Sequence, residues 1–194
     1  MDLEVGRVIR SSTTRFAVGC QVLRPQVPVF GALVKARIQE EDEVFGLIHD
    51  VRVEDDPFVR QMAAASDELR PEYIEDMRQN RQQPIEVGVL VVGYRQGGSI
   101  QQRLPPQPPL SLDAIHTCSG QELTEFTARL DHFSLILDSR DLPSEELLAA
   151  HVRYAAEARD AGERGFLVEA GRELARLLAL EPMRLGGILR RIRP

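Results

Sequence analysis

Residues 84–94 read PIEVGVLVVGY, and this strongly apolar run decides the fold class. At the two-residue period of a strand, Ile85, Val87, Val89 and Val91 share one face. Their β-branched side chains are enriched in strands. We therefore predict a strand over residues 84–94, with one face turned towards a core.

Four more runs upstream of this stretch have the same character. They are rich in valine and glycine, are separated by polar or proline-containing turns, and cover residues 3–9, 16–22, 32–38 and 44–53. Gly46 interrupts the last run at a position typical of a bulge or barrel corner. Five such strands favour a closed antiparallel barrel, because closure removes exposed strand edges.

Two segments break the strand pattern. Pro57 can occupy the first turn of a helix, and Val59 and Met62 follow at helical spacing. We predict a helical insertion near residues 57–82. The four prolines of residues 104–109, LPPQPP, lack the amide donors that a central strand needs. We therefore place the end of a small N-terminal β-barrel at residue 110.

The segment 111–194 is predicted to be mainly α-helical. Ser119 and Glu122 have the spacing of a capping box. Residues 133–137 alternate in part, so a strand returning to the barrel is a second interpretation there. The fold class is therefore a β-barrel followed by helices.

Two longer helices are expected further along. Ser144 is predicted to cap one of them, and His151 lies on its apolar face, where a packed core histidine is expected. The other carries apolar residues from Phe166 to Leu178 and is predicted to stop at Pro182.

Composition limits the function classes. The chain has 194 residues, a net charge of −6, 43% hydrophobic and 28% charged residues. These values suit a folded protein of one large or two small domains and argue against bulk affinity for nucleic acid. No apolar run approaches the ~20 residues of a membrane span, and the N-terminus lacks a signal peptide pattern. The cytoplasm is the expected compartment, where Cys20 and Cys118 would remain thiols.

No complete catalytic site is visible. His116 and Cys118 could bind a metal, but no second ligand pair has suitable spacing. His49 and Asp50 are adjacent on a predicted strand and should point to opposite faces. No nucleophile-elbow pattern surrounds any serine that could serve in a triad, namely Ser99, Ser134 or Ser144. We predict no catalytic residue, no metal ligand and no cofactor.

The basic C-terminal segment is the most suggestive candidate for an interaction site. Arg184, Arg190, Arg191 and Arg193 alternate with apolar residues. They could contact phosphates, lie on an anionic surface or dock in a partner's groove. The alternative is a helix whose apolar side packs on the protein and whose arginines are solvated.

Three motifs in the barrel segment carry a resemblance to a known family. They are VGRVI at residues 5–9 with a Ser/Thr turn after it, PVFGALV at 28–34, and VFGLI at 44–48 followed by VRV at 51–53. Residues 1–110 resemble the HAS-barrel, the N-terminal barrel of HerA-type DNA translocases, which is related to the N-terminal barrel of ATP synthase subunits. The resemblance implies a docking platform for protein partners, a nuclease among them.

The motor domain of that family is missing from this chain. A phosphate-binding loop needs a lysine after a glycine-rich turn, and the single lysine, Lys35, has no such surroundings. We therefore predict a non-enzymatic protein-interaction module whose partner is a translocase or nuclease. Nucleic acid would be reached through that partner, and homo-oligomers remain open. The alternatives are a nucleic-acid-binding barrel that uses the arginine-rich C-terminus and a small hydrolase with a dispersed site.

Overall fold

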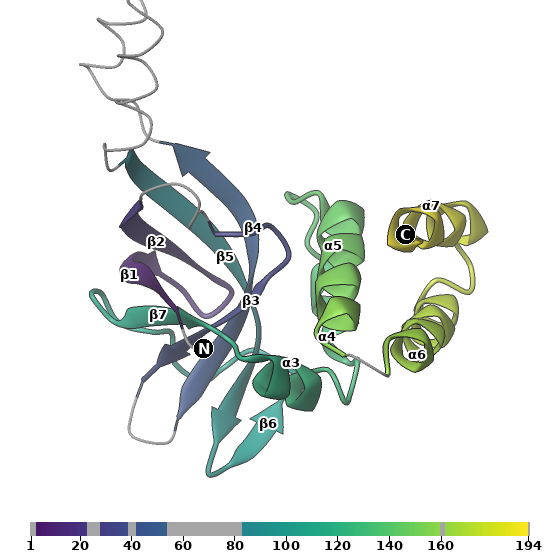
Figure 1. Cartoon of the computed structure of the whole chain (residues 1–194), viewed down its shortest axis with the longest axis horizontal. Coiled ribbons are helices and arrows are strands. Elements are labelled where there is room, and N and C mark those ends of the chain that lie inside the picture. The colour runs from purple at the N-terminus through teal and green to yellow at the C-terminus, as the bar shows by residue number, and fades with distance from the viewer. Residues whose placement is uncertain (1–2, 23–27, 39–41, 54–82, 160–161, 194) are drawn as a thin grey trace, which may run out of the picture.

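Strands and helices form two adjoining layers in the computed structural model (Figure 1). The structure describes residues 3–22, 28–38, 42–53, 83–159 and 162–193. The helical insertion predicted near residues 57–82 lies outside this part of the chain. Within the described part, no helix combines the length and apolar character needed to cross a membrane.

Six antiparallel strands close into a barrel. Seven strands are described in all: β1 (Glu4–Ser11), β2 (Arg15–Val22), β3 (Leu33–Arg37), β4 (Glu43–Val53), β5 (Gln83–Gln96), β6 (Ser99–Gln101) and β7 (Ala114–Thr117). Their order is β2-β1-β7-β3-β4-β5-β6, and β2 also pairs with β5, which closes the ring. The short β6 only extends β5 as a hairpin. Together with the helices described below, this confirms the predicted fold class of a β-barrel combined with α-helices.

The longest strand, β5, has the predicted alternation. Ile85, Val87, Val89 and Val91 are all buried in the barrel interior. The predicted irregularity at Gly46 is also present, because the β4–β5 register shifts between Phe45 and Gly46. A Cβ atom on Gly46 would lie 2.4 Å from the Cγ1 atom of Val89, so glycine allows the two strands to approach.

The strand that completes the barrel, β7, was not predicted. It comes from the segment for which we expected helices, and it lies after the proline-rich residues. It pairs with β1 on one side and with β3 on the other. A four-residue strand carries too short a pattern to be recognised in the sequence.

Five helices are described after β7: α3 (Gly120–Phe126), α4 (His132–Leu137), α5 (Ser144–Glu157), α6 (Glu163–Leu177) and α7 (Pro182–Ile192). The predicted capping box is confirmed, since Ser119 and Glu122 bond to each other's backbone amides. Residues 133–137 belong to a helix, so the interpretation as a returning strand is wrong. His132, Phe133 and Ile136 are buried on one side of α4, which helical spacing explains.

Two predicted helix ends also differ from the structure. Ser144 is the first residue of α5, and Pro143 takes the capping position without a side-chain hydrogen bond. Pro182 begins α7 and does not end α6, which finishes at Leu177. Proline suits the first helical turn because its missing amide would be unpaired there.

Side chains alternate between the two faces of each strand, and apolar residues on both faces produce two cores. One fills the barrel, and the other lies between the outside of β3–β5 and the helices. The strand residues of this second core are Leu33, Phe45, Leu47, Leu90 and Val92. In Figure 1, α4 and α5 stand next to the barrel, whereas α6 and α7 lie on the far side of α5. The helices therefore cover one side of the barrel.

An ion-pair cluster ties the barrel to α3. The ammonium group of Lys35 on β3 pairs with Glu122 and lies 3.7 Å from Glu43. Arg95 on β5 pairs with Glu43 at 3.1 Å and with Glu125 of α3 at 3.0 Å. The single lysine therefore has a structural role at this junction.

Candidate functional site

A tight turn at residues 110–113 projects from the barrel beside β1. The Asp113 amide donates to the Leu110 carbonyl at 3.1 Å, and the Leu110 amide donates to the Asp113 carboxylate at 2.7 Å. Backbone bonds link the turn to Val8, which donates to Asp113 and accepts from Leu112. The turn is therefore held rigidly against the barrel wall.

Leu112 occupies a backbone conformation that leucine disfavours. Its φ is +73°, and it is the only residue other than glycine with a positive φ in the described part of the chain. It takes the third place of the turn, where positive φ usually calls for glycine or asparagine. The side chain is 69% exposed, so burial does not offset the strain. Strain of this kind is concentrated at functional sites.

Two other apolar side chains accompany Leu112. Leu110 is 66% exposed and Ile9 of β1 is 47% exposed. Val8 of β1 bonds to both Leu112 and Asp113, so the turn lies opposite Val8, the residue next to Ile9. We call Ile9, Leu110 and Leu112 the turn surface.

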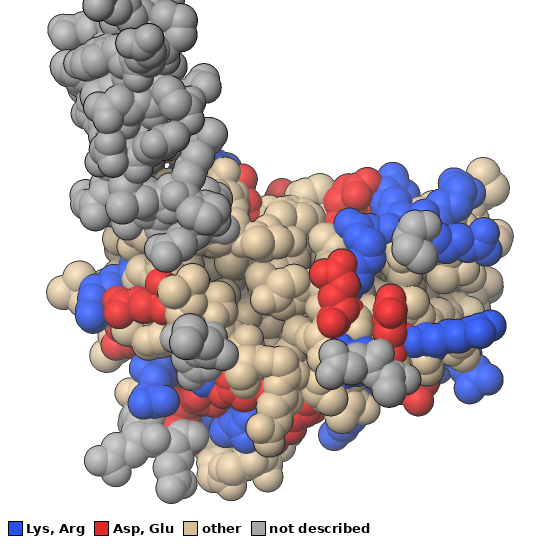
Figure 2. Space-filling view, viewed as in Figure 1, with Lys and Arg blue, Asp and Glu red and all other residues tan. Residues whose placement is uncertain are grey.

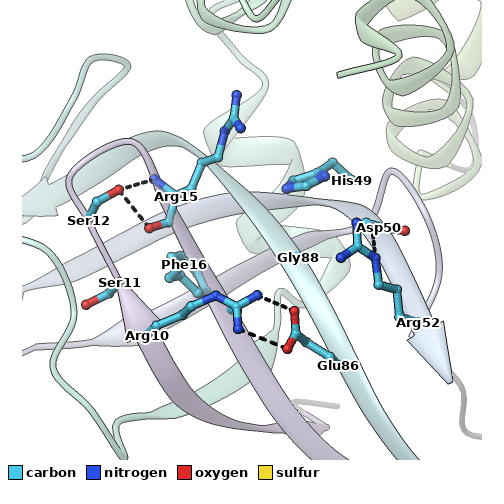
Figure 3. Close-up of a pocket in the computed structure, with 11 residues that line it drawn as sticks. Arg10, Ser11, Ser12, Arg15, Phe16, His49, Asp50, Arg52, Glu86 and Gly88 are labelled. Atoms are coloured by element: carbon cyan, nitrogen blue, oxygen red, sulfur yellow. Dashed lines mark hydrogen bonds and ion pairs between the residues drawn. The ribbon is translucent and has the colours of Figure 1, made fainter. Parts of the chain in front are cut away.

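A groove of about 330 Å³ opens on the outside of the barrel (Figure 3). It is lined from four strands, with Phe16, Ala17 and Gly88 among the lining residues. The charged residues around it are Arg10, Arg15, Asp50, Arg52 and Glu86, and His49 also lines it. We call this the arginine groove.

Carboxylates hold each arginine of the groove. Arg10 reaches across β2 to pair with Glu86 on β5, as Figure 3 shows. Arg52 pairs with Asp50 at 2.7 Å. Arg15 pairs through two nitrogens with Asp141, which comes from the loop between α4 and α5. Two of these carboxylates belong to the groove, and the third is contributed by the helical layer.

Asp141 is the most exposed of the three carboxylates. Its side chain is 67% exposed, whereas that of Glu86 is 16% exposed. The hydrogen bond from Arg15 lowers the pKa of Asp141 to about 2. Burial and the charge of Arg15 lower the pKa of His49, which leaves that ring neutral at pH 7. Arg15, one of the lining residues, therefore presents a fork that binds a carboxylate.

The four arginines of the predicted C-terminal site have different surroundings. Arg184 pairs with Glu145 at 3.1 Å and with Glu181 at 3.4 Å. Arg191 pairs with Glu146 and lies 3.7 Å from Glu145. The other two, Arg190 and Arg193, are exposed.

Basic side chains gather on the side of the molecule formed by the helices, with acidic side chains beside them (Figure 2). On α7, Ile188 and Ile192 are buried. This arrangement matches the packed-helix alternative for α7 and leaves Arg190 and Arg193 for any partner.

His49 and His116 lie in separate places. His116 is on β7, and His49 lines the arginine groove. No group of three or more histidine, cysteine, aspartate or glutamate residues in the described ranges could hold a metal ion. Neither Cys20 nor Cys118 forms a disulfide.

Among the candidate serines, the Ser134 hydroxyl donates to the Asp131 carbonyl at 2.7 Å, and the Ser144 hydroxyl accepts from Arg184 at 3.4 Å. These contacts belong to helix ends and engage no histidine.

His132 and His151 form a buried pair between the barrel and the helices. Their Nε2 atoms are 3.1 Å apart, and His151 Nδ1 lies 3.2 Å from the Gly31 carbonyl. Because a carbonyl only accepts, His151 carries its proton on Nδ1, and His132 donates through Nε2. His132 Nδ1 is then an unprotonated buried nitrogen without a hydrogen-bond partner. The predicted core position of His151 is confirmed, whereas its contact with His132 has no signal in the sequence.

The sequence gives no sign of the turn surface or of the arginine groove. The turn depends on one backbone angle, and the groove combines residues from four strands. A scan against models of protein families matches none, and a search of curated proteins finds no match.

Proposed function

We propose that this chain is a non-enzymatic protein-interaction module, a HAS-like barrel that docks on a protein partner. The resemblance of residues 1–110 implies a DNA-processing ATPase or nuclease as that partner, and we propose a partner of this class. The helical layer covers one side of the barrel. The turn surface lies on β1 and on the turn at residues 110–113.

The observation that carries the proposal is the conformation of Leu112. A leucine at φ +73° with a mostly exposed side chain lowers the stability of the isolated protein. A partner that buries this side chain would supply the missing apolar contact. Exposed apolar side chains held on a rigid turn are typical of a docking surface.

The test is affinity capture from the native host with quantitative mass spectrometry. The tagged chain should recover one consistent partner, and Leu112→Glu should abolish its recovery. Leu180→Glu is the matched control, because Leu180 is 96% exposed but lies at the turn between α6 and α7. A bait that recovers no consistent partner would count against docking as the function.

Nucleic-acid binding is the second candidate, favoured by the arginine groove and by the exposed Arg190 and Arg193. The carboxylates that pair with the groove arginines argue against this function, because they neutralise the charge that would attract phosphates. Fluorescence anisotropy with a labelled DNA duplex separates the two functions. The docking proposal expects no binding at low salt, whereas an affinity that falls steeply with salt would establish the second candidate.

A further inference from the structure

We propose that the partner segment recognised by this chain is acidic and apolar: its apolar side chains pack on the turn surface, and one of its carboxylates replaces Asp141 on Arg15 in the arginine groove. This inference rests on the proposed docking function and names the chemistry of the partner. In the isolated chain, Asp141 occupies the position on Arg15 that the partner's carboxylate would take.

The turn surface and the arginine groove are continuous. Ser11 lines the groove, and its hydroxyl donates to the carbonyl of Pro109, the residue before the turn, at 2.6 Å. Ile9 of the turn surface and Arg10 of the groove are neighbours on β1. A single extended segment can therefore contact both features at once.

The charge of the groove determines the sign of the partner. Among the described residues of its lining, three arginines stand against two carboxylates, Asp50 and Glu86, and His49 is neutral. The formal charge of the lining is thus +1, and Asp141 from the adjoining loop neutralises it. A partner carboxylate restores the same balance, whereas a partner cation would meet like charge.

Asp141 is the carboxylate most easily displaced. Its side chain is mostly exposed, and the surrounding water screens its pair with Arg15. The carboxylate of Glu86 is mostly buried and makes two bonds to Arg10, so it belongs to the groove wall. An incoming carboxylate can occupy the same fork of Arg15, and binding of an apolar segment on the turn would add to that exchange.

The first experiment is photo-crosslinking in the native host with the full chain. A benzophenone amino acid replaces Leu110 in one protein and the exposed Leu180 in a matched control. Crosslinked peptides are then identified by mass spectrometry. We expect position 110 to capture one partner segment with glutamate or aspartate next to apolar residues, and position 180 to capture nothing consistent.

The second experiment measures the affinity of that captured segment as a labelled synthetic peptide. Arg15→Gln should weaken binding about tenfold, the scale of a charged interface contact. Asp141→Asn should strengthen binding severalfold, because it removes the competing carboxylate. A purely structural role for the Arg15–Asp141 pair would make both variants weaken binding. Circular dichroism and melting temperatures establish that each variant is folded.

The experiments distinguish failure of this inference from failure of the proposed docking function. A captured segment without carboxylates, or an Asp141→Asn variant that binds no more tightly, overturns this inference and leaves docking intact. Crosslinks from position 180 alone overturn the choice of surface. If neither position captures a partner and the capture experiment above recovers none, both the inference and the proposed function fall.

Discussion

Leu112 combines a disfavoured backbone angle with an exposed side chain. A left-handed conformation costs an L-residue about 1–2 kcal/mol, whereas glycine adopts it without steric penalty. The hydrogen bonds to Val8 hold the angle in place. The free energy of unfolding is therefore lower than it would be with glycine at this position.

Leu112→Gly should raise the free energy of unfolding by roughly 0.5–1 kcal/mol, because the strain disappears and little burial is lost. Urea unfolding followed by circular dichroism measures the change. Leu110→Gly is the matched control: Leu110 is equally exposed but does not have a positive φ, so glycine should lower stability there. Equal effects at the two positions would contradict the strain argument.

The buried histidine pair predicts how stability depends on pH. Burial lowers the pKa of His151 to about 4 and holds that of His132 well below its ordinary value of 6.5. Both pKa values are lower in the folded state, so the unfolded chain binds more protons between pH 4 and 6.5. The pair therefore contributes its full stability above about pH 6.5 and loses it as the pH falls towards 4.

Urea unfolding at pH 5 and pH 7.5 measures this dependence. At ~1.4 kcal/mol per pKa unit, the shift of His151 alone corresponds to about 3 kcal/mol once its folded pKa is passed. The double variant His132→Phe, His151→Gln should flatten the slope between the two pH values. His116→Gln, which changes a histidine outside the pair, should leave it steep, and a slope that survives the double variant would be evidence against the pair as its origin.

At the scale of elements, α7 shows how a basic segment can be held by its apolar side. Ile188 is fully buried against the second core, and Arg184 and Arg191 pair with acidic residues in the first turn of α5. Acidic side chains at that helix start also interact favourably with its dipole. Packing and charge together dock α7 on α5.

Ile188→Ala should lower the free energy of unfolding by about 2–4 kcal/mol, because it leaves a cavity in a closed core. The matched change is Arg190→Ala, which alters an exposed residue of the same helix and should stay within ~0.5 kcal/mol. Thermal and urea unfolding of both variants measure the difference. A large loss from Arg190→Ala would show that the exposed arginine stabilises the fold.

At the scale of the whole molecule, barrel and helices depend on each other. β7 lies beyond residue 110 yet completes the ring between β1 and β3. The outward-facing Phe45, Leu47 and Leu90 are buried only because the helices cover them. Fully burying each such side chain contributes about 1.5–3 kcal/mol.

A fragment of residues 1–110 should therefore fail to fold as a stable monomer. It lacks β7, and its outer apolar face would be exposed to water. Circular dichroism and amide chemical-shift dispersion measure this, with the full chain as control. A dispersed, cooperative spectrum from the fragment would instead support the domain boundary that we predict at residue 110.

Five of the six barrel strands and most of the helices can be predicted from the sequence, because strand and helix periodicities are local. The alternation in residues 84–94, the bulge at Gly46 and the capping box at Ser119 were all recoverable from spacing. Helix ends are harder to predict from spacing, because a proline such as Pro182 is compatible with the end of one helix and with the start of the next. Residues 133–137 fit a strand or a helix in the sequence, and they form a helix because helical spacing buries Phe133 and Ile136 in the second core.

Where the barrel closes and which residues share a surface depend on contacts between distant parts of the chain. β7 is too short to have a pattern of its own, and its place is set by hydrogen bonds to β1 and β3. The arginine groove joins Arg10, Arg15 and Arg52 because closure brings their strands together. The strain at Leu112 is a property of one dihedral angle, which hydrogen bonds to a distant strand impose and which side-chain periodicity does not encode.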